Sequence, residues 1–205
     1  MPEEATVAYT YGGALKRVYP PNLRKTPFPT LLEDRKEAPR FLFQALTDQT
    51  LFIFTDRGSC FPLSVGKLNE CKPKDRGQQL SALLAGLEDG ETCVWMTCTR
   101  TADLAAAPGL LLVSKRGAVK RMAAAELDVR SRRFSVMNLK DGDTLLAVLP
   151  LPADKDVLLL SRGGAGIRFP QEDVPVQGRV SAGVKGMGLE EGDELILAAA
   201  MDKAS

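Results

Sequence analysis

Apolar and polar positions along the chain follow one recurring pattern: a short apolar strand, a glycine turn, and a second strand in which cations alternate with apolar residues. The clearest copy runs from Leu111 to Met122. Copies at 10–17, 55–62 and 161–168 align with it without gaps, and the last glycine of the four turns falls at 13, 58, 117 and 164. A unit that repeats at such steps must stack on its neighbours to bury its faces, so the pattern predicts a solenoid or a propeller.

A second phrase, leucine followed by acidic residues around a glycine and then an apolar run, closes the last three units at 87–94, 139–146 and 189–196. Glycine supplies the positive φ of a tight turn, and the acidic neighbours can cap backbone donors there. The pair Glu190 and Glu191 could also be read as an acid and a base or as a metal site. Because the carboxylates recur at one place in each of these units, whereas a catalytic site is needed once, we interpret the phrase as a structural turn.

The remaining segments predict strands and connections, with no long helix. Five prolines within residues 20–40 predict a loop around the outside of the fold. The helix-compatible stretches 101–107 and 123–127 are too short to stand alone and are expected to form single turns. The fold class is therefore all-β, with about four four-stranded units.

The chain is expected to form a single domain over residues 5–201. The repeat units divide it roughly at 5–50, 51–108, 109–155 and 156–201.

Composition excludes several classes of protein. The 205 residues are 44% hydrophobic, enough for a core, and no apolar run approaches the ~20 residues that span a bilayer. The first residues lack the features of a signal peptide, so we expect a cytoplasmic protein. The four cysteines form no C-x-x-C pair and histidine is absent, which argues against a zinc site and favours reduced, buried cysteines.

The net charge of +1 hides a segregation of charge along the repeat. The blocks 10–25, 55–76, 114–140 and 161–186, which hold the turns and second strands, together carry +14, and the rest of the chain carries −13. If the repeats close around an axis, the basic blocks can line one rim while the acidic connections occupy another.

Both phrases, repeated in register, resemble the carboxy-terminal domain of the A subunit of bacterial type IIA topoisomerases, DNA gyrase and topoisomerase IV. The resemblance covers about Ala5 to Met201. It implies a β-pinwheel, a propeller-like disc whose blades exchange strands, with a basic rim that wraps duplex DNA. It also implies a non-catalytic accessory domain whose partners are duplex DNA, the breakage-reunion domain of the same polypeptide and, through that domain, the ATPase-bearing B subunit.

This chain departs from the family pattern in two ways. The gyrase box, Gln-Arg-Arg-Gly-Gly-Lys/Arg-Gly, is missing, and residues 20–27 read PPNLRKTP in its place. This absence implies a topoisomerase IV-like or degenerate gyrase domain that wraps DNA weakly. About four units, where the family more often has five or six, imply a compact or open variant or a piece of a longer domain.

Cations of the four basic blocks are the candidate DNA contacts, because lysine and arginine neutralise phosphates and release counterions. No aromatic stripe accompanies them, which favours the duplex backbone over stacked single strands. The predicted contacts are Lys16, Arg17, Arg24, Lys25, Arg57, Lys67, Arg76, Lys115, Arg116, Lys120, Arg121, Arg130, Arg132, Arg133, Arg162, Arg168, Arg179 and Lys185. We expect no catalytic residue, metal or cofactor in this domain, and action at the nucleoid in the cytoplasm.

Two other functions are possible in principle. Catalysis finds no support, because the chain has no histidine relay or cysteine motif. The resemblance implies that the DNA-cleaving tyrosine belongs to the breakage-reunion domain, and the tyrosines of this chain lie in or beside the first hairpin instead. The alternative to DNA binding is a propeller that binds proteins, in which charge segregation keeps the surface soluble.

Overall fold

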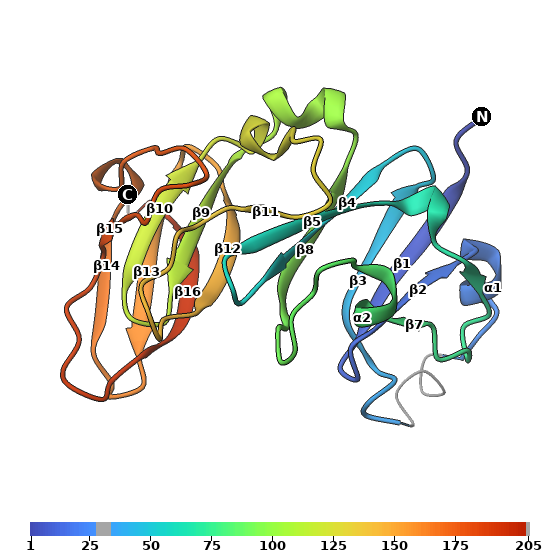
Figure 1. The fold of residues 1–205 in the computed structure, drawn as a ribbon, viewed down its shortest axis with the longest axis horizontal. Coiled ribbons are helices and arrows are strands. Elements are labelled where there is room, and N and C mark those ends of the chain that lie inside the picture. The colour runs from blue at the N-terminus through green and yellow to red at the C-terminus, as the bar shows by residue number, and fades with distance from the viewer. Residues whose placement is uncertain (28–33, 204–205) are drawn as a thin grey trace. The chain divides into compact units, whose positions relative to one another are not determined.

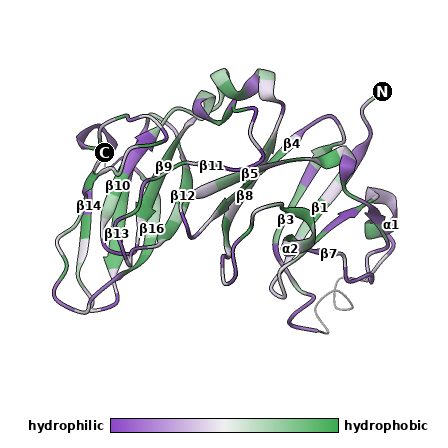
Figure 2. Ribbon diagram, in the orientation of Figure 1, coloured by the Kyte–Doolittle hydropathy of each residue, from purple (hydrophilic) through white to green (hydrophobic). Residues whose placement is uncertain are grey.

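The computed structural model describes residues 1–27 and 34–203 and is all-β, as predicted from the sequence. Its strands form four sheets, and apolar residues concentrate in the strands while the connections are mostly hydrophilic (Figures 1 and 2). Contacts divide the chain into two compact units. The first comprises residues 1–53, 61–89 and 96–101, and the second comprises residues 54–60, 90–95 and 102–205. Each is described by itself.

The first sheet lies in the first unit and has the strand order β3-β1-β2-β6, with β7 also paired to β2. The first predicted hairpin is present here, and its turn glycine, Gly13, has a φ of +84°. The strands are β1 (Glu4–Thr10), β2 (Ala14–Val18), β3 (Pro39–Leu46), β6 (Glu70–Cys71) and β7 (Gln78–Gln79).

The proline-rich connection after β2 begins with a helix, α1 (Pro20–Arg24), which starts at proline because the first turn of a helix needs no proline N–H. Residues 28–33 of the connection lie outside the described part of the chain. Its end is tied to the first hairpin, because Gly12 N–H donates to Lys36 O at 2.7 Å.

The second sheet has the order β11-β5-β4-β8, and β4, β5 and β8 contribute residues to both units. The inner strand β4 of this sheet is buried on both faces, since Leu51 to Phe54 are at most 2% exposed. The strands are β4 (Thr50–Thr55), β5 (Ser59–Ser64), β8 (Cys93–Thr99) and β11 (Phe134–Ser135). Between β5 and β8 the chain forms the 3-10 turn Val65–Lys67 and the helix α2 (Leu80–Leu83).

The third and fourth sheets belong to the second unit and share one hydrophobic core, to which Leu111, Val113, Val157 and Leu159 contribute fully buried side chains. The third sheet, in the order β12-β9-β10-β15, contains β9 (Gly109–Ser114), β10 (Ala118–Met122), β12 (Leu145–Leu151) and β15 (Val184–Lys185). The fourth, in the order β14-β13-β16, contains β13 (Lys155–Ser161), β14 (Gly166–Pro170) and β16 (Leu195–Asp202).

Each of the first three sheets receives its last strand from the segment that follows the next hairpin along the chain. Thus β6 and β7 follow the β4–β5 hairpin yet pair with β2, β11 follows β9–β10 yet pairs with β5, and β15 follows β13–β14 yet pairs with β10. We call these donated segments. This exchange of strands agrees with the pinwheel that the resemblance implied.

The helix-compatible stretches are short, as predicted: they form the 3-10 helices Thr101–Ala106 and Ala124–Leu127, and a further 3-10 turn spans Gln171–Asp173. None of the four cysteines forms a disulfide within the described part of the chain, and Cys60 and Cys93 are buried. Burial, assisted by Asp48, raises the pKa of the Cys98 thiol to about 11, which keeps it protonated at neutral pH. Within residues 1–27 and 34–203, no helix has the length and apolar character needed to cross a membrane.

Candidate nucleic-acid interface

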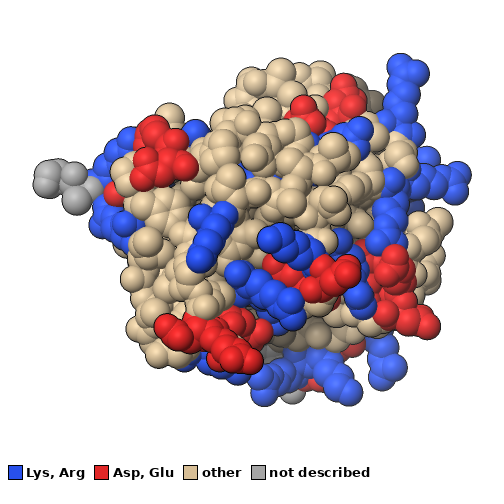
Figure 3. All heavy atoms as spheres, turned by 60° about the vertical axis from the view of Figure 1, so that its left-hand side comes forward, with Lys and Arg blue, Asp and Glu red and all other residues tan. Residues whose placement is uncertain are grey.

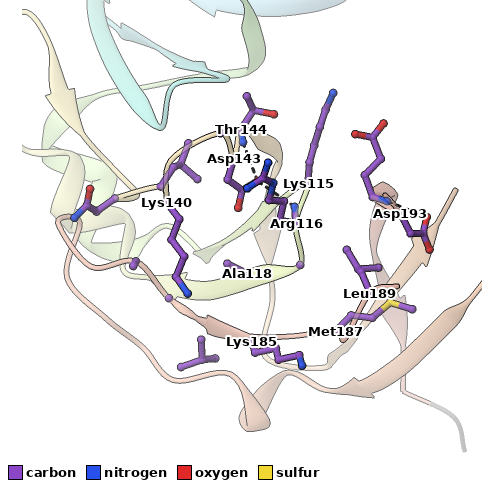
Figure 4. A pocket seen from close by; sticks show the side chains of 18 of the residues that line it. Lys115, Arg116, Ala118, Lys140, Asp143, Thr144, Lys185, Met187, Leu189 and Asp193 are labelled. Carbon is purple, nitrogen blue, oxygen red and sulfur yellow. Dashed lines mark hydrogen bonds between the residues drawn. The ribbon is translucent and has the colours of Figure 1, made fainter. Parts of the chain in front are cut away.

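The clearest candidate site is a pocket of about 770 Å³ in the second unit (Figure 4). The basic turn of the β9–β10 hairpin, the acidic turn after Leu139, the acidic turn after Leu189 and the donated segment that contains β15 line it together. Both sequence phrases therefore meet at one place. Three lysines from three different segments, Lys115, Lys140 and Lys185, contribute to its lining.

Aspartates of the acidic phrase hold the neighbouring hairpin turns. Asp143 Oδ1 accepts hydrogen bonds from Arg116 N–H at 3.0 Å and Thr144 N–H at 2.8 Å. Asp193 Oδ1 does the same for Gly163 N–H and Glu194 N–H, at 2.9 and 2.8 Å. A hydrogen bond from Ser161, with the one from Gly163 N–H, holds the pKa of Asp193 below its ordinary value. These carboxylates cap backbone donors, as the sequence indicated.

The expected separation of an acidic rim from a basic rim is wrong in the second unit. Asp143, Glu190, Asp193 and Glu194 line the same pocket as the basic hairpin. The reason is the capping just described, since a carboxylate that binds hairpin N–H groups must lie beside the hairpin cations. Figure 3 shows the result, with acidic side chains interspersed among lysines and arginines on the face drawn.

Eleven of the eighteen predicted contacts are exposed, and the side chains of nine of these form no ion pair with another described residue. The half-buried Lys115 also forms no such ion pair. The nine exposed residues are Arg24, Lys25, Arg57, Lys67, Arg76, Arg116, Arg130, Arg132 and Lys185. Among them, Arg116 donates to Asp141 O at 3.1 Å.

Two exposed arginines of the fourth sheet are paired. Arg162 forms an ion pair with Glu194 at 2.6 Å, and Arg168 forms one with Asp156 at 2.9 Å. Ion pairs at exposed positions are weak, so a phosphate can compete for these guanidinium groups.

The remaining predicted cations lie partly or fully inside the sheets. Lys16 is 5% exposed and pairs with Glu37 at 3.1 Å, while the buried Nε of its neighbour Arg17 has no hydrogen-bond partner among the described residues. Arg121 donates to Val174 O at 2.6 Å and to Gln171 Oε1 at 3.3 Å. Arg179, half-buried, lies over the ring of Phe134, with its Cζ 5.9 Å from the ring centroid.

Lys120 is fully buried, which makes it a structural cation in this unit. Its ammonium donates to the carbonyl oxygens of Gly178, Arg179 and Ser181 at 3.0, 3.0 and 3.2 Å. It thereby holds the loop that leads into β15. The sequence could not distinguish it from Lys115, because both lie in the same basic phrase.

The pH dependence of stability tests this assignment of Lys120. Burial lowers the pKa of Lys120 to about 8, against a smaller raising effect of Glu126. Between about pH 8 and about pH 10.5, the Lys120 ammonium has lost its proton in the folded chain but keeps it in the unfolded chain. Because the unfolded state binds more protons over this range, Lys120 should make the free energy of unfolding rise with pH. Urea denaturation at a series of pH values measures the effect. Lys120→Met should remove this part of the rise, and an unchanged profile in the variant would contradict the assignment.

Arg133 also has a structural role. Its guanidinium contacts Ser59 Oγ at 3.1 Å and pairs with the carboxylate of Glu91 at 3.2 Å, and the Glu91 side chain is 0% exposed. Arg133 was predicted as a DNA contact together with Arg130 and Arg132, whereas in the structure its guanidinium is bound by Ser59 and Glu91. The Glu91 carboxylate, which also accepts a hydrogen bond from Thr55 Oγ1, draws it into the fold.

Lys140 was missed as a candidate contact from the sequence, although it lines the pocket. It precedes Asp141-Gly142 in the acidic phrase, which was interpreted as a turn only. Its place at the end of the basic block 114–140, beside the glycine turn of the acidic phrase, was the signal that could have found it.

Known proteins similar to this chain match nearly its whole length. The profile of the DNA gyrase C-terminal domain, beta-propeller, matches residues 49–100, 110–152 and 155–200. The A subunit of DNA topoisomerase 4 from Streptococcus pneumoniae serotype 4 is 31% identical over 198 residues, which are 94% of this chain and 24% of that protein. The A subunit of DNA gyrase from Chlamydia pneumoniae is 30% identical over 169 residues, 80% of this chain and 20% of that protein. The chain thus spans about a quarter or less of the length of these relatives.

Solved structures agree on the fold. The crystal structure of the C-terminal domain of DNA topoisomerase IV superposes with a TM-score of 0.89 at 22% identity, over 99% of this chain and 62% of that one. The E. coli ParC C-terminal domain gives a TM-score of 0.76 at 16% identity, over 98% of this chain and 80% of that one. Since the family profile matches well over half of the residues, the chain belongs to the family of the DNA gyrase C-terminal domain, a β-propeller of the pinwheel type.

Proposed function

We propose that this chain is a non-catalytic, DNA-binding part of a type IIA topoisomerase A subunit, which holds and bends duplex DNA through its phosphates. The observation that carries the proposal is the set of three lysines around the pocket of the second unit, Lys115, Lys140 and Lys185. None of them forms an ion pair with another described residue, so their charges are available to phosphates. The exposed Arg130 and Arg132 add two more such charges.

Binding of this kind needs neither metal nor cofactor, because the cations neutralise phosphates directly. The module would present duplex DNA to the breakage-reunion domain of its own polypeptide and, through that domain, to the B subunit. Its relatives are bacterial topoisomerase subunits, so we place its action in the cytoplasm, at the nucleoid. Acidic residues within the pocket should limit how tightly the duplex is held, consistent with weak wrapping.

Salt dependence of binding tests the proposed function. Five phosphate contacts predict a slope of log K against log salt of about −4.5, at about −0.9 for each neutralised phosphate. Fluorescence anisotropy on a duplex of ~40 base pairs at several salt concentrations measures the slope, with a scrambled sequence of the same length as the control. We expect little difference between the two sequences. Affinity that does not change with salt would contradict the proposal.

A second candidate function is protein binding at the same pocket. The observation in its favour is the group of acidic residues there, Asp143, Glu190, Asp193 and Glu194, which would repel phosphates and attract a partner of mixed charge. Absence of duplex binding at low salt would favour this function.

A further inference from the structure

The ammonium group of the buried Lys120 is enclosed by oxygen atoms of residues 178–181, which we call the 178–181 loop. Besides the three carbonyl oxygens given above, the hydroxyl oxygen of Ser181 lies 3.3 Å from Lys120 Nζ. The loop is also closed on itself, because Ser181 N–H and Ser181 Oγ donate to Gly178 O at 3.2 and 2.9 Å. An ammonium group has three protons, so Lys120 has none left to donate to a phosphate.

The 178–181 loop supports Lys185 from the N-terminal side of β15. The chain after the loop passes directly over β10, since a Cβ atom at Gly183 would lie 2.5 Å from Val119 O. The strand β15 then pairs with β10 through two residues only, and the N–H groups of the next two residues donate to Gly117 O at 2.8 and 3.3 Å. With so few contacts along β15, the position of Lys185 depends on the loop that precedes it.

The same loop holds the segment that carries Lys140. Asn138 N–H donates to Ser181 O at 3.0 Å, and the same oxygen accepts a hydrogen bond from Lys120 Nζ at 3.2 Å. Asn138 and Lys140 both line the pocket. One carbonyl oxygen therefore joins the buried lysine to the segments of two pocket lysines, Lys140 and Lys185.

The third pocket lysine, Lys115, lies at the turn of the hairpin whose second strand contains Lys120. All three pocket lysines, which Figure 4 shows on three segments around the pocket, are thus tied to Lys120. We infer from this geometry that Lys120 is a positioning residue of the DNA interface, which sets the spacing of Lys115, Lys140 and Lys185 without touching a phosphate. The inference rests on the proposed function, because phosphates recur at regular distances along a duplex and a displaced lysine would miss its phosphate.

A double-mutant cycle tests this role of Lys120. At pH 7, where Lys120 with its pKa of about 8 is protonated, Lys120→Met should weaken binding of the ~40 base-pair duplex by about tenfold, because Lys140 and Lys185 lose their support. In a chain that already carries Lys140→Ala and Lys185→Ala, the same substitution should weaken binding by less than about twofold. Fluorescence anisotropy at low salt measures the affinities, at a temperature at which the thermal melt of each variant shows a folded chain.

The matched control is Lys120→Met in a chain that carries Arg130→Ala and Arg132→Ala. This background also lacks two exposed cations, but neither arginine side chain forms a hydrogen bond with the 178–181 loop within residues 1–27 and 34–203. Here Lys120→Met should keep its effect of about tenfold. A role of Lys120 in stability alone would give equal losses in both backgrounds, so a difference between them reports positioning.

Ser181→Ala is a second variant, which changes the loop while Lys120 stays in place. It removes the hydroxyl that contacts Lys120 Nζ and that donates to Gly178 O. Binding should weaken by about threefold in the parent and remain unchanged in the chain without Lys140 and Lys185. This variant decides the question if Lys120→Met does not fold.

Equal losses for Lys120→Met in both backgrounds would overturn the inference, as would parent-like binding by both Lys120→Met and Ser181→Ala. Where Lys120→Met does not fold, parent-like binding by Ser181→Ala alone overturns it. In each of these cases the parent still binds duplex in a salt-dependent way, so the proposed function stands. A parent that does not bind duplex at low salt overturns the proposed function and, with it, this role of Lys120.

Discussion

Arg133→Ala should lower the free energy of unfolding by about 3–5 kcal/mol, the range for breaking a buried ion pair. The reason is Glu91, whose fully buried carboxylate is paired with the Arg133 guanidinium at 3.2 Å. Without this guanidinium a desolvated negative charge loses its cationic partner, and the hydrogen bond from Thr55 does not replace it. Urea denaturation at neutral pH measures the change.

The neighbouring Arg132→Ala is the matched control, because Arg132 is exposed and should change stability by less than about 0.5 kcal/mol. Adding Glu91→Gln to Arg133→Ala removes the uncompensated charge and should restore at least half of the lost stability. If the double variant is no more stable than Arg133→Ala, the buried charge is not the cause of the loss.

Replacing Arg130 and Arg132 together by alanine should weaken duplex binding roughly tenfold at every sequence tested and flatten the salt slope by about two, one for each lost phosphate contact. Both side chains are exposed, so the melting temperature should not change. Anisotropy on the ~40 base-pair duplex, beside a thermal melt, separates binding from folding. Arg133 is left in place because its replacement should also lower the free energy of unfolding, which would confuse the comparison.

Lys36→Ala with Arg40→Ala is the control for this experiment. Both residues are exposed cations of the first unit, Lys36 in the proline-rich connection and Arg40 at the start of β3, which we place off the DNA path, and the variant removes the same charge. An equal loss of affinity in the control, or normal binding by the Arg130 and Arg132 variant, would contradict the DNA path proposed here. The protein-binding alternative would then gain support.

The turns of this fold could be predicted from the sequence because the backbone conformation of each turn requires glycine at one position. Gly58, Gly117 and Gly164 of the basic phrase, and Gly142 and Gly192 of the acidic phrase, all have positive φ. Few other residues adopt this conformation without strain, so the requirement is visible in one sequence. The all-β fold follows from these turns and the apolar runs between them.

The donated segments could not be predicted because they depend on distant pairing. The strands β11 and β15 each have two residues, too short to show the alternation that identifies a strand. Their partners lie more than 60 residues earlier in the chain. The shared Met-x-Leu at 137–139 and 187–189 was the available signal, and it becomes meaningful only with Gly58 and Gly117 beside it.

The site was predicted in its general location, with errors in the roles of individual cations. Lys115 and Lys120 belong to the same basic phrase, yet one lines the open pocket and the other is fully buried. Charge alone does not reveal which face of a strand another segment will cover. The buried lysine is therefore recognised only once the loop 178–181 is placed over it.

Because its first three sheets receive strands from later segments, the protein can complete each of them only after the donated segment has been synthesised. The second sheet needs Phe134 and Ser135, so it has an unpaired edge until the ribosome has released a segment more than 70 residues beyond its own hairpin. Contacts of such long sequence separation slow folding and leave strand edges exposed to aggregation. Nascent chains that stall before Phe134 and Ser135 have left the ribosome should therefore depend on chaperones more than chains that stall after both residues have left it.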